Sequence, residues 1–145
     1  MKIVLHQANF RSLFGLVCSA STLSQWSHSS IITDDGKWYD TTFKRGYSGL
    51  REIEPARKVR VFGLPDHILS SEDLADIVGI RYDYIGLLLW LFNIHSTNRM
   101  YCYESALLAI KKVGIEVITG QASPHKIINA LKGFNSRYCL EGEIL

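Results

Sequence analysis

The sequence predicts an α+β fold in which a small antiparallel sheet packs against helices. The first observation is a series of short β-type runs between residues 27 and 62, separated by turn-forming residues. The second is a change of period from residue 70 onward, where apolar residues recur at helical spacing. The third is size, because 145 residues that are 47% apolar and 21% charged suit one domain spanning residues 1–145.

A strand and a helix are expected before the sheet. Residues 2–6 are predicted to form the strand. Four apolar residues between Phe10 and Val17 follow the i, i+3, i+4, i+7 spacing of one helix face, and Asn9 stands in the N-cap position. This pattern predicts a helix over 10–20.

A hairpin is the most distinct feature of the predicted sheet. Asp34-Asp35-Gly36 is a turn sequence, and β-type runs over 27–33 and 37–43 flank it. Because a tight turn joins antiparallel neighbours, these two runs are expected to pair. Two further strands complete the predicted sheet: residues 50–53 and residues 59–62.

The second half of the chain is predicted to be helical. Ser70 and Asp73 have the hydroxyl–acid spacing of a capping box, Gly114 follows the clearest helical pattern, and Pro124 suits a first helical position. The expected elements are a helix beginning near residue 70, helices over 84–92, 101–113 and 124–131, and a short strand over 115–118.

Charge and hydropathy limit the classes of partner. The 16 basic and 14 acidic residues leave a net charge of +2, which gives no sign of the strongly basic face that binds nucleic acid. The most apolar run, residues 85–94, is far shorter than the ~20 residues that span a bilayer, so a buried helix is expected there. A membrane-facing or lipid-binding helix is the alternative. The composition favours no membrane contact and defines no oligomeric state.

The N-terminal segment lacks the pattern of a signal peptide. Polar residues such as His6, Gln7 and Arg11 interrupt the apolar core that such a peptide requires. A cytoplasmic protein is therefore expected, although a virus-encoded enzyme released by another route also fits this pattern.

Cys102 is the candidate nucleophile among three cysteines. The odd number argues against a disulfide framework. Cys102 lies at the start of the helix expected over 101–113, where free amides and the helix dipole stabilise a thiolate and an oxyanion. Cys18 and Cys139 are expected to pack as small apolar residues.

His28 is the candidate for the base that a nucleophilic cysteine needs, and Asp40 is the carboxylate expected to orient it. They lie on the two runs of the hairpin, and a tight turn places them near the same end of adjacent strands. A carboxylate beside an imidazole fixes its tautomer and sustains its proton affinity. These residues therefore predict a Cys102–His28–Asp40 triad. The structural alternative is a core cysteine, a hydrogen-bonded strand end and a surface carboxylate.

No metal or cofactor is expected. The remaining histidines have no metal-ligand spacing with one another or with a cysteine, and the sequence has neither a glycine-rich phosphate loop nor a serine-nucleophile elbow. These histidines are His6, His67, His95 and His125.

Four segments, taken in order along the chain, resemble a known superfamily. They are the histidine hairpin (26–32 and 36–40), a Gly-x-x-Tyr-Asp segment (79–83), the helix around the cysteine (101–108) and a Ser-Pro helix start (123–124). This set resembles the circularly permuted NlpC-type superfamily, which has a papain-like fold and includes the lecithin–retinol acyltransferase relatives. The resemblance extends from Lys2 to about Leu131.

The resemblance implies a single permuted papain-like domain and a cysteine hydrolase. Its expected reaction is cleavage of an amide bond, in a peptide or cell-wall-like substrate, through a thioester on Cys102. The alternatives are a lipid acyltransferase or thiol esterase on the same triad, and a non-catalytic binding or structural module. Tyr82 is expected either to line the substrate cleft or to pack beneath the nucleophile helix.

Two positions depart from the pattern of that superfamily. Asp40 stands where relatives usually have Glu, His or another polar residue, so a shorter side chain must reach the imidazole. Tyr103 follows the nucleophile where a small residue is usual, and its ring is expected to narrow the cleft.

Overall fold

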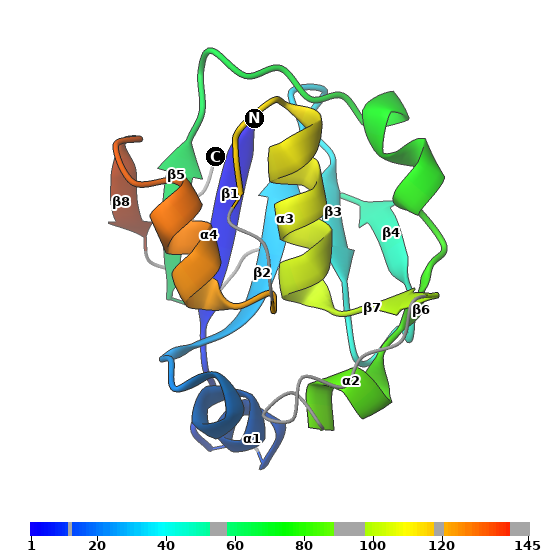
Figure 1. Cartoon of the computed structure of the whole chain (residues 1–145), viewed down its shortest axis with the longest axis vertical. Coiled ribbons are helices and arrows are strands. Elements are labelled where there is room, and N and C mark those ends of the chain that lie inside the picture. The colour runs from blue at the N-terminus through cyan, green and yellow to red at the C-terminus, as the bar shows by residue number, and fades with distance from the viewer. Residues whose placement is uncertain (12, 53–57, 89–97, 118–120, 140–145) are drawn as a thin grey trace.

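The structure is a computed structural model, and it describes residues 1–11, 13–52, 58–88, 98–117 and 121–139. Its main feature is a six-stranded antiparallel sheet with helices packed against it, so the predicted α+β class is confirmed (Figure 1). The strand order is β4-β3-β2-β1-β5-β8. These strands are β1 (Lys2–Gln7), β2 (Trp26–Ile32), β3 (Trp38–Thr41), β4 (Ser48–Arg51), β5 (Val59–Gly63) and β8 (Ser136–Cys139).

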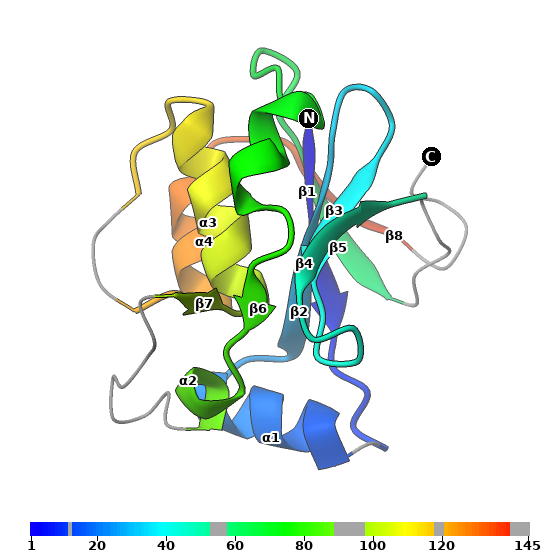
Figure 2. The ribbon, with the colours of Figure 1, turned by 90° about the vertical axis from the view of Figure 1, so that its right-hand side faces the viewer.

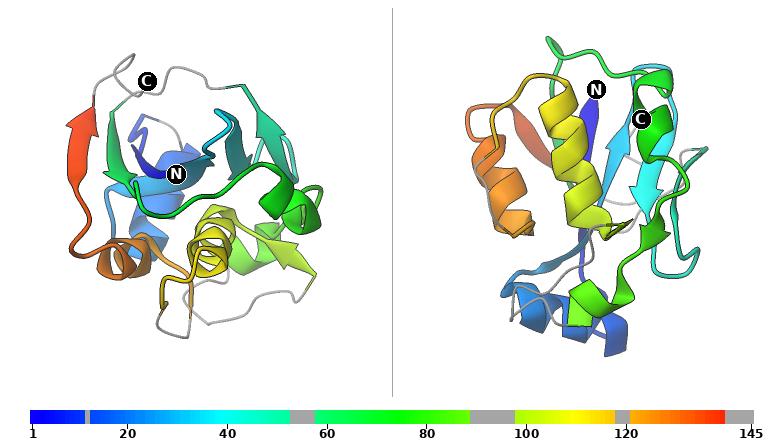
Figure 3. Two further views of the ribbon diagram at one scale, coloured as in Figure 1. Left: turned by 90° about the horizontal axis from the view of Figure 1, so that it is seen from above. Right: turned by 45° about the vertical axis from the view of Figure 1, so that its right-hand side comes forward.

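Helices occupy one side and one end of this sheet. α3 and α4 lie on one side of it, whereas α1 and α2 lie across the end where β1 finishes and β2 begins (Figures 2 and 3). β6 and β7 form a short parallel pair. β6 precedes α2, and β7 lies between α2 and α3. These elements are α1 (Leu13–Thr22), a 3₁₀ helix (Glu72–Ile77), β6 (Arg81–Tyr82), α2 (Tyr84–Leu88), β7 (Arg99–Met100), α3 (Cys102–Lys112) and α4 (Pro124–Ala130).

The sheet carries a different apolar cluster on each face. Successive side chains of a strand point to opposite faces, so Ile3 and Leu5 of β1 join α3 in the main core, whereas Val4 joins a smaller second cluster. His6 lies two residues after Val4 and pairs with His28 across β1 and β2. Two-residue periodicity therefore places His6 on the face of the second cluster, where its ring contacts that of Trp38 at a centroid distance of 5.5 Å.

Several predicted elements differ from those observed. β6, β7 and β8 were not predicted, because each is short and forms by pairing with a segment distant in sequence. The prediction of a strand over 115–118 is wrong for residues 115–117, which do not form a strand. Residue 118 lies outside the described residues. The helix expected at 84–92 is described only as far as Leu88. The Asn9 side chain accepts a hydrogen bond from the Arg11 amide (3.1 Å) in the turn before α1, which begins at Leu13.

Asp83 fixes the start of α2. Its carboxylate is fully buried and accepts a hydrogen bond from the Gly86 amide (2.8 Å), while its own amide donates to the Met100 carbonyl (3.0 Å). The carboxylate occupies the space beside Gly86 that a side chain would need, so a Cβ atom at position 86 would collide with it. Asp83 thus connects α2 to β7, the strand that leads into α3.

Replacing Gly86 with alanine tests this packing. We expect Gly86→Ala to lower the free energy of unfolding by about 1–3 kcal/mol, because overpacking displaces a buried, hydrogen-bonded carboxylate. Gly63→Ala is the matched control, since a Cβ there meets no atom within 4 Å. Urea denaturation of both variants measures the difference, and equal stability of the two would contradict this account of α2.

Candidate active site

Cys102 is the first residue of α3, and several polar contacts fix its backbone. Its carbonyl accepts hydrogen bonds from the hydroxyls of Ser29 and Ser105, each at 2.8 Å. The Glu104 carboxylate accepts a hydrogen bond from the Tyr101 amide (3.0 Å), which satisfies a free donor and places negative charge at the positive end of the helix. The start of α3 is therefore tied to β2 at a defined position.

Tyr103 holds α3 against the sheet. Its side chain is 1% exposed, and its hydroxyl donates a hydrogen bond to the Trp26 carbonyl (2.7 Å). The ring therefore packs in the core, and a narrowing of the substrate cleft by Tyr103 stays a prediction. Burial of the ring explains how a large residue is accommodated directly after the candidate nucleophile.

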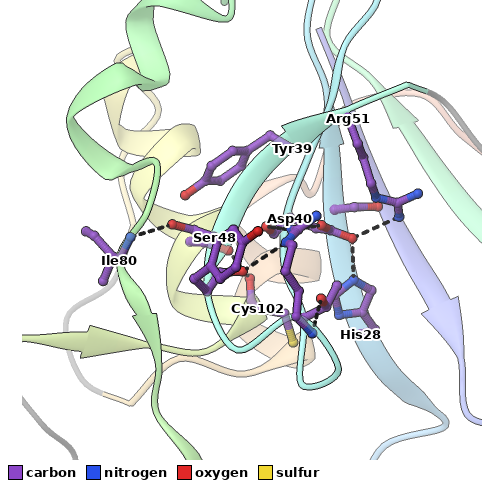
Figure 4. Close-up of polar contacts among 12 residues, drawn as sticks. His28, Tyr39, Asp40, Ser48, Arg51, Ile80 and Cys102 are labelled. Atoms are coloured by element: carbon purple, nitrogen blue, oxygen red, sulfur yellow. Dashed lines mark hydrogen bonds and ion pairs between the residues drawn. The ribbon is translucent and has the colours of Figure 1, made fainter.

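The structure brings His28, Asp40 and Cys102 together (Figure 4). His28 Nε2 lies 3.2 Å from Asp40 Oδ2. Because the carboxylate accepts this contact, Nε2 carries a proton and Nδ1 is left to face another partner. Cys102 lies near enough to His28 for the charge of its sulfur to act on the imidazole. The His28 ring therefore has a carboxylate in contact and a cysteine nearby, the three kinds of group that an activated thiol uses.

His28 carries a positive charge at neutral pH. Burial lowers its pKa, but the negative charge of the Cys102 sulfur and the contacts with Asp40 outweigh that effect and raise the pKa to about 10. Its side chain is 23% exposed, so one part of the ring reaches the surface while the rest is buried. An imidazolium beside a sulfur favours the thiolate form of a cysteine.

Asp40 is a buried carboxylate held by three cations. Its side chain is fully buried, and Oδ1 accepts from Arg45 (2.6 Å) while Oδ2 accepts from Arg51 (3.0 Å) and His28. Arg45 also donates to the Asp40 carbonyl (2.7 Å). Burial raises the pKa of this carboxyl, but hydrogen bonds and charge from His28 and Arg51 hold it well below the usual range. Asp40 therefore remains ionised and can orient His28.

His6 belongs to the same cluster and was not singled out by the sequence. Its ring centroid lies 5.0 Å from that of His28, and its Nε2 lies 2.6 Å from Ser30 Oγ. Burial and the positive charge of His28 lower its pKa well below the ordinary value, so His6 is neutral. The only sequence signal for it is its position on a strand, and its neighbours follow from the pairing of β1 with β2.

Tyr82 lies beside the site but is buried. The residue is 3% exposed, and its ring contacts the rings of Phe43 and Tyr84 at centroid distances of 6.0 and 5.0 Å. Burial and the negative charge of Cys102 raise the pKa of its phenol. This burial favours the packing role over the cleft-lining role, and contact with substrate stays a prediction.

The other cysteines differ from Cys102 in their surroundings. Cys18 is buried in α1, and burial together with the charge of Cys102 raises the pKa of its thiol to about 12, so it stays protonated. The backbone of Cys139 lies in β8, and its side chain is outside the part that the structure describes. In the described ranges, no three His, Cys, Asp or Glu side chains are arranged to hold a metal ion.

Comparison with protein-family models, curated proteins and solved structures gave no match. Among the helices that the structure describes, none is long and apolar enough to cross a membrane. The functional assignment therefore depends on the residues of the site itself.

Proposed function

We propose that this protein is a cysteine hydrolase that cleaves an amide bond through a thioester intermediate. The single observation that carries the proposal is the position of His28, which contacts the ionised Asp40 at 3.2 Å and lies near enough to Cys102 for the charge of the sulfur to raise its pKa. A cysteine, a base and an orienting carboxylate close together are the parts that thiol-based acyl transfer requires.

The reaction follows from these positions. The Cys102 sulfur attacks the carbonyl carbon, and the electron pair of the carbonyl moves to its oxygen. In this proposal the amide of Cys102, the first of α3, contributes a hydrogen bond to that oxyanion. When the tetrahedral intermediate collapses, His28 gives its proton to the leaving nitrogen and the thioester remains. His28 then accepts a proton from water, whose oxygen displaces the sulfur and releases a carboxylic acid.

A circularly permuted papain-like arrangement is part of this proposal. Its support is the chain order of the site: the base lies on β2, the carboxylate on β3, and the nucleophile far downstream at the start of α3. The nucleophile helix also packs on the antiparallel sheet that carries the base (Figure 2). A lipid acyltransferase or thiol esterase would use the same residues.

A non-catalytic module is the second candidate, and one observation favours it. Cys102 is only 2% exposed, whereas a nucleophile must reach a carbonyl carbon. In such a module, Cys102 would react with acyl reagents no faster than the buried Cys18. The reactivity of these two thiols therefore distinguishes the two candidates.

Labelling with an activated acyl ester tests the proposal. We expect p-nitrophenyl acetate to acylate Cys102, Cys102→Ala to abolish that acylation, and Cys18→Ala to leave it unchanged. Peptide mass spectrometry identifies the acylated residue, and circular dichroism verifies that both variants are folded. Acylation of Cys18 or Cys139 in place of Cys102 would refute the assignment.

A further inference from the structure

An apolar surface adjoins the candidate active site. Phe43 and Tyr84 contact each other and the ring of Tyr82, and the Tyr84 hydroxyl donates to the Phe43 carbonyl (3.0 Å), so this surface is held in place. Arg45 connects this surface to the candidate site. The Arg45 guanidinium donates to the Asp40 carboxylate and lies 5.3 Å from the centre of the Tyr47 ring. Its exposed members are Phe43 (46% exposed), Tyr47 (47%), Tyr84 (38%) and Ile85 (57%).

Exposed basic residues accompany these apolar side chains. Lys44 lies in the β3–β4 turn, and Arg81 and Arg99 are partners across β6 and β7. Like charges directly opposite each other on paired strands are destabilising unless something offsets them. Within the described part of the chain, no ion pair involves any of these three residues. The pairing of Arg81 with Arg99 therefore favours an anion as the missing counter-charge.

Exposed carboxylates are segregated from this surface. Near the site, the described carboxylates are Asp40 and Asp83, both fully buried, and Glu104, which accepts from the Tyr101 amide. All exposed carboxylates among the described residues belong to segments at the opposite end of the molecule (Figures 1 and 2). They are Asp34, Asp35, Glu52, Asp66, Glu72, Asp73, Asp76 and Glu116.

We propose that this aromatic–basic surface, formed by the apolar residues Phe43, Tyr47, Tyr84 and Ile85 and the basic residues Lys44, Arg81 and Arg99, docks on an anionic lipid membrane. Aromatic and aliphatic side chains enter the boundary between headgroups and acyl chains, and neighbouring Lys and Arg side chains attract anionic headgroups. The near-neutral total charge conceals this arrangement, because the exposed carboxylates among the described residues lie away from the aromatic–basic surface. Docking does not depend on the proposed catalysis, but it would present the triad to acyl groups at the membrane surface.

Vesicle flotation tests the docking surface. We expect the protein to float with vesicles of phosphatidylcholine and phosphatidylglycerol but not with phosphatidylcholine alone. Binding is expected to fall when salt rises from about 0.1 M to 1 M, which shortens the Debye length from ~10 to ~3 Å. We expect each of Lys44→Glu, Arg81→Glu and Arg99→Glu to weaken binding by about fivefold or more. The double variant Phe43→Ser/Ile85→Ser is expected to weaken binding by at least about tenfold.

Matched controls lie at the other end of the molecule. Ile68 is 80% exposed between β5 and the 3₁₀ helix, and Lys111 is exposed in the last turn of α3, so Ile68→Ser and Lys111→Glu are expected to bind as the wild type does. Cys102→Ala is also expected to bind unchanged, which separates docking from catalysis.

Three results would overturn the docking proposal. The first is a lack of preference for vesicles that contain phosphatidylglycerol. The second is equal binding by the surface variants and their controls. The third is a wild-type dimer in analytical ultracentrifugation that the Phe43→Ser/Ile85→Ser variant converts to monomer, because a second copy of the chain would then be the occupant of the surface.

Discussion

Replacing His28 with alanine is expected to slow acylation of Cys102 by at least about 10³-fold at neutral pH. General acid–base catalysis alone contributes roughly 10²–10⁴-fold, and the residues of a triad act as a unit. His28 contacts Asp40 and lies within electrostatic reach of Cys102, so its loss removes the proposed proton carrier between the carboxylate and the thiol. The rate of p-nitrophenol release during the first turnover measures the effect.

A second histidine gives the matched control for this experiment. His125 is exposed on α4, and its Nε2 lies 3.3 Å from the Leu23 carbonyl oxygen. We expect His125→Ala to acylate at the wild-type rate. A His28→Ala variant that is folded and reacts within threefold of wild type would show that His28 is not the base.

Replacing Asp40 with alanine is expected to lower the free energy of unfolding by about 3–5 kcal/mol. Removing one partner of a buried ionic cluster leaves the others uncompensated, and here three cations lose their shared carboxylate. Asp76→Ala is the matched control, because Asp76 forms an exposed ion pair with Lys112 and is expected to cost at most about 1 kcal/mol. Urea denaturation of both variants measures the difference, and equal losses would contradict the cluster.

The stability of this cluster depends on pH in a defined direction. The pKa of Asp40 is lower in the folded protein than its ordinary value of 3.8, so its contribution is complete above that value and is lost as the pH falls further. The pKa of His28 is raised from 6.5 to about 10, so its contribution is complete below pH 6.5 and is lost as the pH rises toward 10. The pKa of His6, which belongs to the same cluster, is lowered below 6.5, so its contribution is complete above pH 6.5 and is lost as the pH falls. Maximum stability of the cluster is therefore expected near pH 6.5.

Local signals in the sequence were sufficient to predict that His28 and Asp40 lie side by side. The turn at Asp34-Asp35-Gly36 implies that two strands pair, and residues 28 and 40 then lie near one another whatever the rest of the sheet does. The helix start at Cys102 is equally local, since helical spacing and a capping acid define it. Each of these features depends on residues that are close together in the sequence.

The parts that could not be predicted depend on long-range pairing. His6 reaches His28 only because β1 lies beside β2, and the Arg45 and Arg51 contacts with Asp40 depend on how β4 returns along β3. β8 is a short polar strand that forms because β5 offers an edge. No local pattern encodes which strands become neighbours, so these residues were not linked to the site beforehand.

The most direct test of the Cys102–His28 pair is the pH dependence of Cys102 alkylation by iodoacetamide in the wild type and in His28→Ala. The wild type is predicted to react at least about tenfold faster than His28→Ala at about pH 6, because a charged imidazole lies near the sulfur. His28→Ala is predicted to lose about tenfold in rate per pH unit below about pH 8.5, as an ordinary thiol does. Superimposable profiles for the two proteins would contradict the pair and, with it, the proposed nucleophile.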